Sequence, residues 1–193
     1  MNKIVTTIVS QKQRWIFCGG LSLLALLPNY WPSVLTNLMW QREALENSQY
    51  WRLLTAHVVH LDLRHLLLNL LGLILICELL WDELALADAL ALLLFSALGV
   101  SLLLWLNQPQ LIWYAGLSGV LHGLWAGCAG AGFLRQNNLF YACALLLLAV
   151  KLVFPSQMAT ALPVVSVAHL YGALSGLLWL GLKQLQQAEP VFD

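Results

Sequence analysis

The sequence predicts an all-α polytopic membrane protein, built as a bundle of six transmembrane helices. Three observations predict this class: an apolar composition, six long apolar runs, and prolines confined to the ends of those runs. Hydrophobic residues make up 61% of the 193-residue chain and charged residues only 9%, against roughly 45–50% and about 25% in soluble domains. A soluble fold of this composition would lack the polar groups needed to cover its surface.

The charge balance excludes two further classes of protein. Disordered chains combine few apolar residues with much charge, which is the opposite of this composition. Nine Lys and Arg residues balance nine Asp and Glu residues, so the formal net charge is zero. Binding of nucleic acid therefore has no electrostatic basis, and the lipid bilayer is the expected surrounding.

Six apolar runs are expected to span the membrane. Their continuous apolarity, without a period of two residues, favours helices over barrel strands. All six prolines lie at or outside the ends of the runs, where a missing backbone N–H is tolerated. The runs are Trp15–Tyr30, Leu63–Leu80, Leu84–Leu106, Leu117–Leu134, Leu139–Phe154 and Val164–Leu182.

The remaining segments set the domain boundaries and the orientation. Residues 1–14 are expected to form a polar cytoplasmic tail, residues 15–183 one domain, and residues 184–193 a C-terminal tail. A long loop of about residues 31–62 mixes aromatic and charged residues, which is typical of a segment lying in the membrane interface. The distribution of Lys and Arg favours both termini on the cytoplasmic side.

The four cysteines are expected to be small buried apolar residues. Cys18, Cys77, Cys128 and Cys143 all lie within apolar runs. Their spacing indicates neither a zinc site nor a disulfide framework.

A first group of polar residues begins the second run. Asp62 is a candidate N-cap, and His65 and Asn69 share one helix face because they are four residues apart. Asn69 lies in an otherwise apolar stretch, where a polar side chain is costly. His57 and His60 precede the helix, either as parts of a hydrated loop or as functional residues.

A second group surrounds Ser118, which opens the fourth run between glycines. Taken alone, a serine at this position is explained as a helix cap. Gly119, Gly123 and Gly127 continue at four-residue spacing and form a smooth face for close helix packing.

The third group lies in the last run, where His169 is the sole histidine and the run has no Asp, Glu, Lys or Arg. Ala168, Gly172 and Gly176 form a second small-residue face. Close packing of the two faces would bring Ser118 within hydrogen-bond distance of His169.

These groups contain the parts of a serine hydrolase. A serine becomes a useful nucleophile when a neighbouring base takes its proton, and an imidazole is suited to that role. The amide of Asn69, the ring of His65 and the backbone N–H of Ser118 are candidate donors for a developing oxyanion. No Asp or Glu lies near His169 in sequence, so a dyad is expected rather than a triad.

Three motifs resemble those of the rhomboid intramembrane serine proteases in order and in the run that carries each. They are His60-x4-His65-x3-Asn69, Gly116-Leu117-Ser118-Gly119 and Ala168-His169-x2-Gly172, and Trp51-Arg52 in the long loop resembles a fourth. The resemblance extends from about Trp51 to Leu182 and implies a rhomboid-like six-helix bundle.

The resemblance also implies the roles of the residues. Ser118 would be the nucleophile and His169 the base, with His65, Asn69 and the Gly116–Ser118 backbone around the oxyanion. Family members cleave membrane-anchored protein substrates without metal or cofactor. Where many rhomboids carry a tyrosine that stacks on the catalytic histidine, this chain has His122. His122 is expected to stack on His169 or orient it, and His60 is a further support residue.

The compact form and the sequence Gly-Leu-Ser-Gly-Val-Leu-His-Gly resemble the rhombosortase branch. That branch implies a bacterial inner-membrane protein, with the site toward the outer side, that cleaves at a Gly-rich C-terminal anchor. Two alternatives remain open: a metal-binding membrane hydrolase or transporter that uses His57, His60 and His65, and an inactive rhomboid relative that binds membrane helices.

Overall fold

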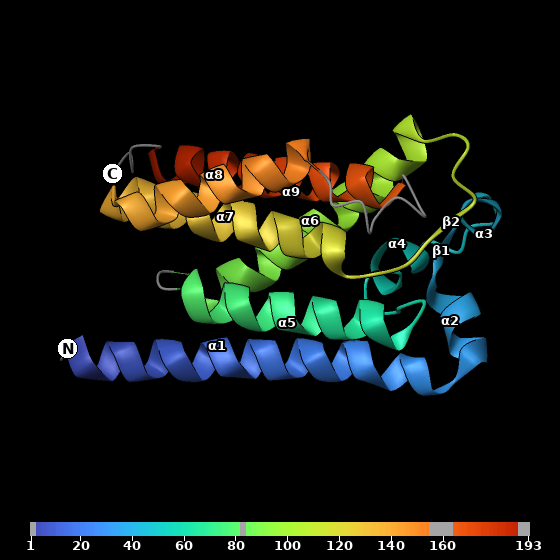
Figure 1. Ribbon diagram of the computed structural model, residues 1–193, viewed down its shortest axis with the longest axis horizontal. Helices are drawn as coiled ribbons and strands as arrows, with labels where there is room; N and C mark the ends of the chain where they lie inside the picture. The colour runs from blue at the N-terminus through green and yellow to red at the C-terminus, as the bar shows by residue number, and fades with distance from the viewer. Residues whose placement is uncertain (1–2, 82–83, 155–163, 189–193) are drawn as a thin grey trace, which may run out of the picture.

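The computed structural model describes residues 3–81, 84–154 and 164–188, and within these ranges the chain is mostly helical. The long helices lie along one another as a bundle, with α1 beginning and α9 ending at the same end (Figure 1). They are α1 (Lys3–Leu26), α5 (Leu63–Leu79), α6 (Leu86–Asn107), α7 (Ser118–Gln136), α8 (Leu139–Val153) and α9 (Val164–Ala188).

The predicted helical class is confirmed, and α5 to α9 begin within about two residues of the predicted runs. In the described ranges α6 is the one helix long and apolar enough to cross a membrane by length and composition, and α8 is a shorter apolar helix. The count of six spans therefore stays a prediction.

Helices α1 and α9 extend beyond the apolar runs. Helix α1 begins at Lys3 rather than Trp15, and α9 continues to Ala188 rather than ending at Leu182. No proline or glycine precedes Gly19, and the Gln, Lys and Arg residues near these ends are good helix formers. Apolarity marks the packed or lipid-facing part of a helix, whereas the helix itself continues until a residue breaks it.

The long loop is built of short ordered elements at one end of the bundle (Figure 1). Strand β1 pairs antiparallel with β2, which precedes α7, so that Trp40 lies opposite Tyr114. The loop is thereby tied to the start of α7. Helix α1 ends at Leu26, and η1 (Leu27–Tyr30) completes the predicted first run. The elements of the loop are α2 (Pro32–Leu38), β1 (Trp40–Gln41), α3 (Arg42–Glu46) and α4 (Arg52–Thr55), and β2 is Trp113–Tyr114.

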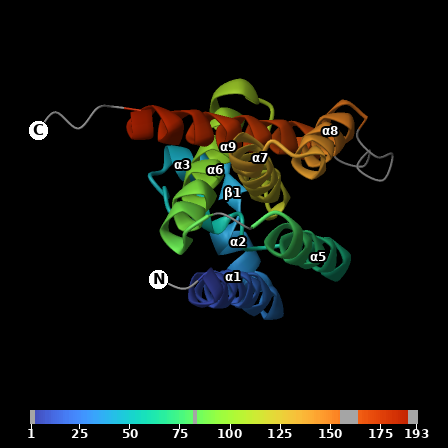
Figure 2. The ribbon, with the colours of Figure 1, turned by 90° about the vertical axis from the view of Figure 1, so that its left-hand side faces the viewer.

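Helix α7 lies at the centre of the bundle, between α6, α9, α8 and α5 (Figure 2). Its glycines allow α9 to approach closely. A Cβ on Gly172 would collide with the carbonyl of Gly119, and a Cβ on Gly176 would collide with the carbonyl of Gly123. The predicted packing of the two small-residue faces is confirmed.

The cysteine prediction holds for three of the four residues. Cys18, Cys77 and Cys128 are buried between helices, whereas Cys143 is exposed. The prediction for Cys143 is wrong because α8 lies at the edge of the bundle and packs mainly on α7 (Figure 2). An apolar run in a membrane protein has an outward face as well as a packed one.

Candidate active site

The hydroxyl of Ser118 contacts the ring of His169. The distance from Ser118 Oγ to His169 Nε2 is 2.9 Å, and 51 residues separate the two in sequence. Ser118 is the first residue of α7, and the position before it, Leu117, provides no side-chain cap. The hydroxyl therefore pairs with α9, and the explanation of Ser118 as a simple helix cap does not apply.

The turn before Ser118 depends on Gly116. This residue has φ of +129°, which side chains disfavour, and a Cβ there would lie 2.5 Å from Cε1 of His65. Its N–H donates to the carbonyl of Ala56 at 2.9 Å, and its carbonyl accepts from the Tyr114 hydroxyl at 2.9 Å. These bonds fix the chain that presents Ser118.

Helix α5 places the ring of His65 beside Gly116 and carries Asn69 one turn further along. Asp62 caps the helix by accepting from the N–H of His65 at 2.7 Å, which confirms the predicted N-cap. Asn69 is buried, and its Nδ2 donates to the carbonyl of His65 at 3.0 Å. Because an amide nitrogen carries two protons, this bond uses one and leaves the second for another acceptor.

His60 packs against His65 before α5 begins. The ring centroids are 5.0 Å apart, and His60 is buried. Burial, followed by the charge that His65 carries when protonated, lowers the pKa of His60 to about 3. Its imidazole is therefore neutral at physiological pH, where it can accept or donate a hydrogen bond without a charge.

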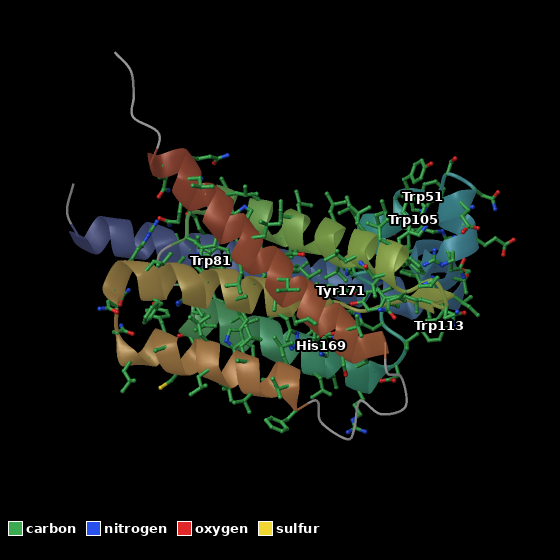
Figure 3. All side chains as sticks on the ribbon, turned by 90° about the horizontal axis from the view of Figure 1, so that it is seen from above. Trp51, Trp81, Trp105, Trp113, His169 and Tyr171 are labelled. Carbon is green, nitrogen blue, oxygen red and sulfur yellow. The ribbon has the colours of Figure 1, made fainter. Side chains whose placement is uncertain are left out.

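His122 stacks on His169, with ring centroids 4.0 Å apart and planes 9° apart. Its Nδ1 lies 2.6 Å from the carbonyl of Ser118. Because a carbonyl only accepts, Nδ1 carries the proton and donates. Trp125 follows in the same direction, with a ring 6.4 Å from that of His122. Figure 3 shows His169 on α9, above α7.

The side chain of His57 contacts α6. Its Nε2 lies 3.0 Å from both the carbonyl of Ala97 and the hydroxyl of Ser101, on α6, and its ring faces Tyr114 at 5.7 Å. His57 is therefore not brought together with His60 and His65 as a ligand set. In the part of the chain that the structure describes, no group of three or more His, Cys, Asp or Glu side chains is arranged to hold a metal ion.

Sequence reasoning missed Tyr114 and Ser101. Tyr114 fixes the Gly116 carbonyl, and Ser101 donates to the carbonyl of Leu53 at 2.7 Å. The available signal was weak: a tyrosine two residues before a glycine, and a serine within an apolar run. Both bonds join segments that are distant or locally irregular, which spacing does not reveal.

Comparison with known proteins places the whole cluster within one domain. A family model described as the Rhomboid domain matches residues 47–184, and none of the curated proteins compared with the sequence matches it. Rhomboid proteins are integral membrane proteins and serine proteases. Because the matched range covers well over half of the chain and contains every residue of the cluster, this chain belongs to the rhomboid family.

Proposed function

We propose that this protein is an intramembrane serine endopeptidase that cleaves membrane-anchored protein substrates with Ser118 and His169. The observation that supports the proposal most strongly is the 2.9 Å separation of Ser118 Oγ and His169 Nε2. That distance lies within the range needed for proton transfer from nucleophile to base.

The reaction proceeds through two acyl transfers. His169 Nε2 takes the proton from Ser118 Oγ as the oxygen bonds to the scissile carbonyl carbon. The C–N bond then breaks, and the amine leaves with the proton from His169. Water, activated in the same way, hydrolyses the ester and restores the serine. An amine in place of water would give transpeptidation.

Three donors stabilise the oxyanion. The N–H of Ser118 stands in the first turn of α7, where backbone N–H groups have no intrahelical acceptor. The second amide proton of Asn69 and the ring of His65 complete the set. Each donor of this kind contributes about 3–4 kcal/mol when the charge forms in a site prepared for it.

His122 and His60 support the reacting groups. His122 holds the plane of the His169 ring by stacking and is itself fixed by its bond to the Ser118 carbonyl. The ring of His60 packs edge-to-face against the ring of His65. Both act through their neighbours and are positioning residues.

The substrate proposed is a bacterial surface or secreted protein with a Gly-rich C-terminal membrane anchor, as in the rhombosortase branch. An intact helix hides its carbonyls in intrachain hydrogen bonds, so the scissile segment must unwind. Glycine favours unwinding because it disfavours helix by about 1 kcal/mol relative to alanine. The protein would act in the inner membrane with the site toward the outer side. We further propose that the substrate enters past α8 and the segment Pro155–Pro163, which lies outside the described residues.

A cleavage assay in liposomes tests the proposal. The substrate is a single-span protein with a Gly-rich segment before its C-terminal helix, and products are located by mass spectrometry. Ser118→Ala and His169→Ala should each reduce cleavage by at least about 10³-fold, whereas Ser33→Ala, an exposed serine on α2, should cleave normally. Full cleavage by Ser118→Ala would refute the proposal.

A further inference from the structure

A lysine in the apolar helix α8 lies near the row of rings that contains His169. Lys151 is two residues from the end of α8, and no carboxylate in the described ranges forms an ion pair with it. A charged side chain in a spanning segment is costly, and such residues mark functional sites and usually have a partner.

The ammonium of Lys151 is held over an aromatic ring of α7. Its Nζ lies 5.9 Å from the ring centroid of Trp125, within the range of a cation–π contact. The indole N–H of Trp125 donates to the carbonyl of Ala144 on α8 at 3.1 Å. The ring is thus fixed between the two helices, and it directs the lysine toward α7 rather than outward along α8.

The same ring lies next to His122, which contacts His169. The rings of Trp125 and His122 are tilted by 33° with centroids 6.4 Å apart, and His122 stacks on His169. Lys151 and His169 therefore lie at the two ends of one row of side chains. A substrate bound at Ser118 would pass close to the charge of Lys151.

The depth of Lys151 favours a protein partner over a lipid. Trp125 is seven residues after Ser118 on α7, which corresponds to about 10 Å along the helix in the direction away from the loop end. Lipid phosphates lie at the membrane surface, whereas the spanning segment of a substrate cut at Ser118 continues inward past this level.

We propose that Lys151 is a specificity-determining residue that binds a carboxylate side chain in the spanning segment of the substrate. A distance of about 10 Å corresponds to roughly three residues of extended chain or seven of helix. The carboxylate therefore lies roughly three to seven residues from the scissile bond, on the side that enters the membrane. This inference rests on the proposed protease function.

A charge scan of the substrate tests the inference. Glu, and separately Gln, is placed at each of these positions in the single-span substrate, and kcat/KM is measured in neutral-lipid liposomes. At one position the wild-type enzyme should prefer Glu over Gln by about tenfold, the effect of a close charge pair of modest strength. Lys151→Met should lower that ratio to about one, Lys151→Glu should invert it, and Lys151→Arg should keep most of it. Val150→Met, at an exposed neighbour on α8, is the matched control and should keep the wild-type ratio.

The outcomes separate this inference from the proposed function. No cleavage of any substrate would refute the protease proposal. Cleavage that depends on Ser118 but is equal for Glu and Gln at every position would refute the role of Lys151 alone. If Lys151→Met lowered kcat/KM equally for the Glu and Gln substrates, the lysine would act only on α8. The assay is repeated in liposomes that contain anionic lipid, and a decrease in kcat/KM of Lys151→Met seen only there would assign the ammonium to lipid phosphate. Either result would overturn the inference.

Discussion

At the residue scale, the contact between Ser118 and His169 depends on the side chains that hold the imidazole of His169. The ring stacks on His122 and contacts Ser118 through its Nε2, while the Nδ1 of His122 donates to the backbone carbonyl of Ser118. Ser118, His122 and His169 therefore form one positioned unit in which a shift of any member moves the others.

Substitution of His122 separates stacking from hydrogen bonding. His122→Phe keeps a flat ring but loses the hydrogen bond to Ser118. Because such a bond contributes about 1 kcal/mol, we expect a roughly fivefold lower kcat. His122→Ala loses both contacts, about 2–3 kcal/mol in total, which predicts a decrease of roughly 50-fold with little change in KM. Steady-state kinetics with thermal unfolding as a control would measure this. Equal losses for Phe and Ala would contradict the positioning role.

The low pKa of His60 should make the free energy of unfolding depend on pH. Its folded pKa of about 3 lies below the ordinary value of 6.5, so between these values the unfolded chain binds a proton that the folded chain excludes. The free energy of unfolding should therefore decrease as the pH falls from about 6.5 toward 3. His60→Asn should show a shallower decrease in the same titration, and identical pH profiles would rule out this contribution.

At the element scale, the contact between α7 and α9 sets the distance between Ser118 and His169. Their backbones approach where Gly172 faces Gly119 and Gly176 faces Gly123. The four-residue spacing of small residues made this contact predictable, because one helix face repeats about every four residues. Ser118 and His169 were predictable for a related reason, since each is a polar residue beside such a face.

Adding a methyl group to this contact should separate the helices. Gly172→Ala should destabilise the protein by about 1–3 kcal/mol and reduce cleavage, because its Cβ would meet the Gly119 carbonyl. Gly181→Ala, on the same helix but with open space around it, should be neutral or stabilising by up to about 1 kcal/mol. Unfolding in detergent micelles measures both, and equal stability of the two variants would contradict the packing account.

The loop elements could not be predicted in the same way. Arg42 donates from one guanidinium to the carbonyls of Trp105, Gln108 and Leu111 at 2.9–3.2 Å, across more than 60 residues of sequence. Bonds from a side chain to distant backbone carbonyls leave no periodic pattern. The same reason explains why the bond from Ser101 to Leu53 was not predicted. The bond from Tyr114 to Gly116 lies in an irregular turn, which leaves no periodic pattern either.

At the scale of the whole molecule, four of the tryptophans lie toward the two ends of the bundle. Trp51, Trp105 and Trp113 gather at the loop end and Trp81 lies at the other (Figure 3). Large hydrophobic side chains such as Leu68, Leu146 and Leu178 are exposed on the helices between them. This distribution is typical of interfacial aromatic belts around a lipid-facing band.

The predicted orientation places both termini in the cytoplasm and the loop end outside. A C-terminal fluorescent-protein fusion should fluoresce, and a C-terminal alkaline phosphatase fusion should be inactive, because the phosphatase needs the oxidising outer compartment to form its disulfides. The reverse pattern would show that the site opens toward the cytoplasm, and the proposed surface-protein substrates would then be excluded.

Covalent labelling shows whether His169 activates Ser118. Membranes containing the protein are treated with a biotin-linked fluorophosphonate, and the modified residue is mapped by mass spectrometry. We expect an adduct on Ser118, absent in Ser118→Ala, greatly reduced in His169→Ala and unchanged in Ser33→Ala. Labelling of Ser118 that does not depend on His169, or no labelling of Ser118 in a protein that is folded, would contradict this activation.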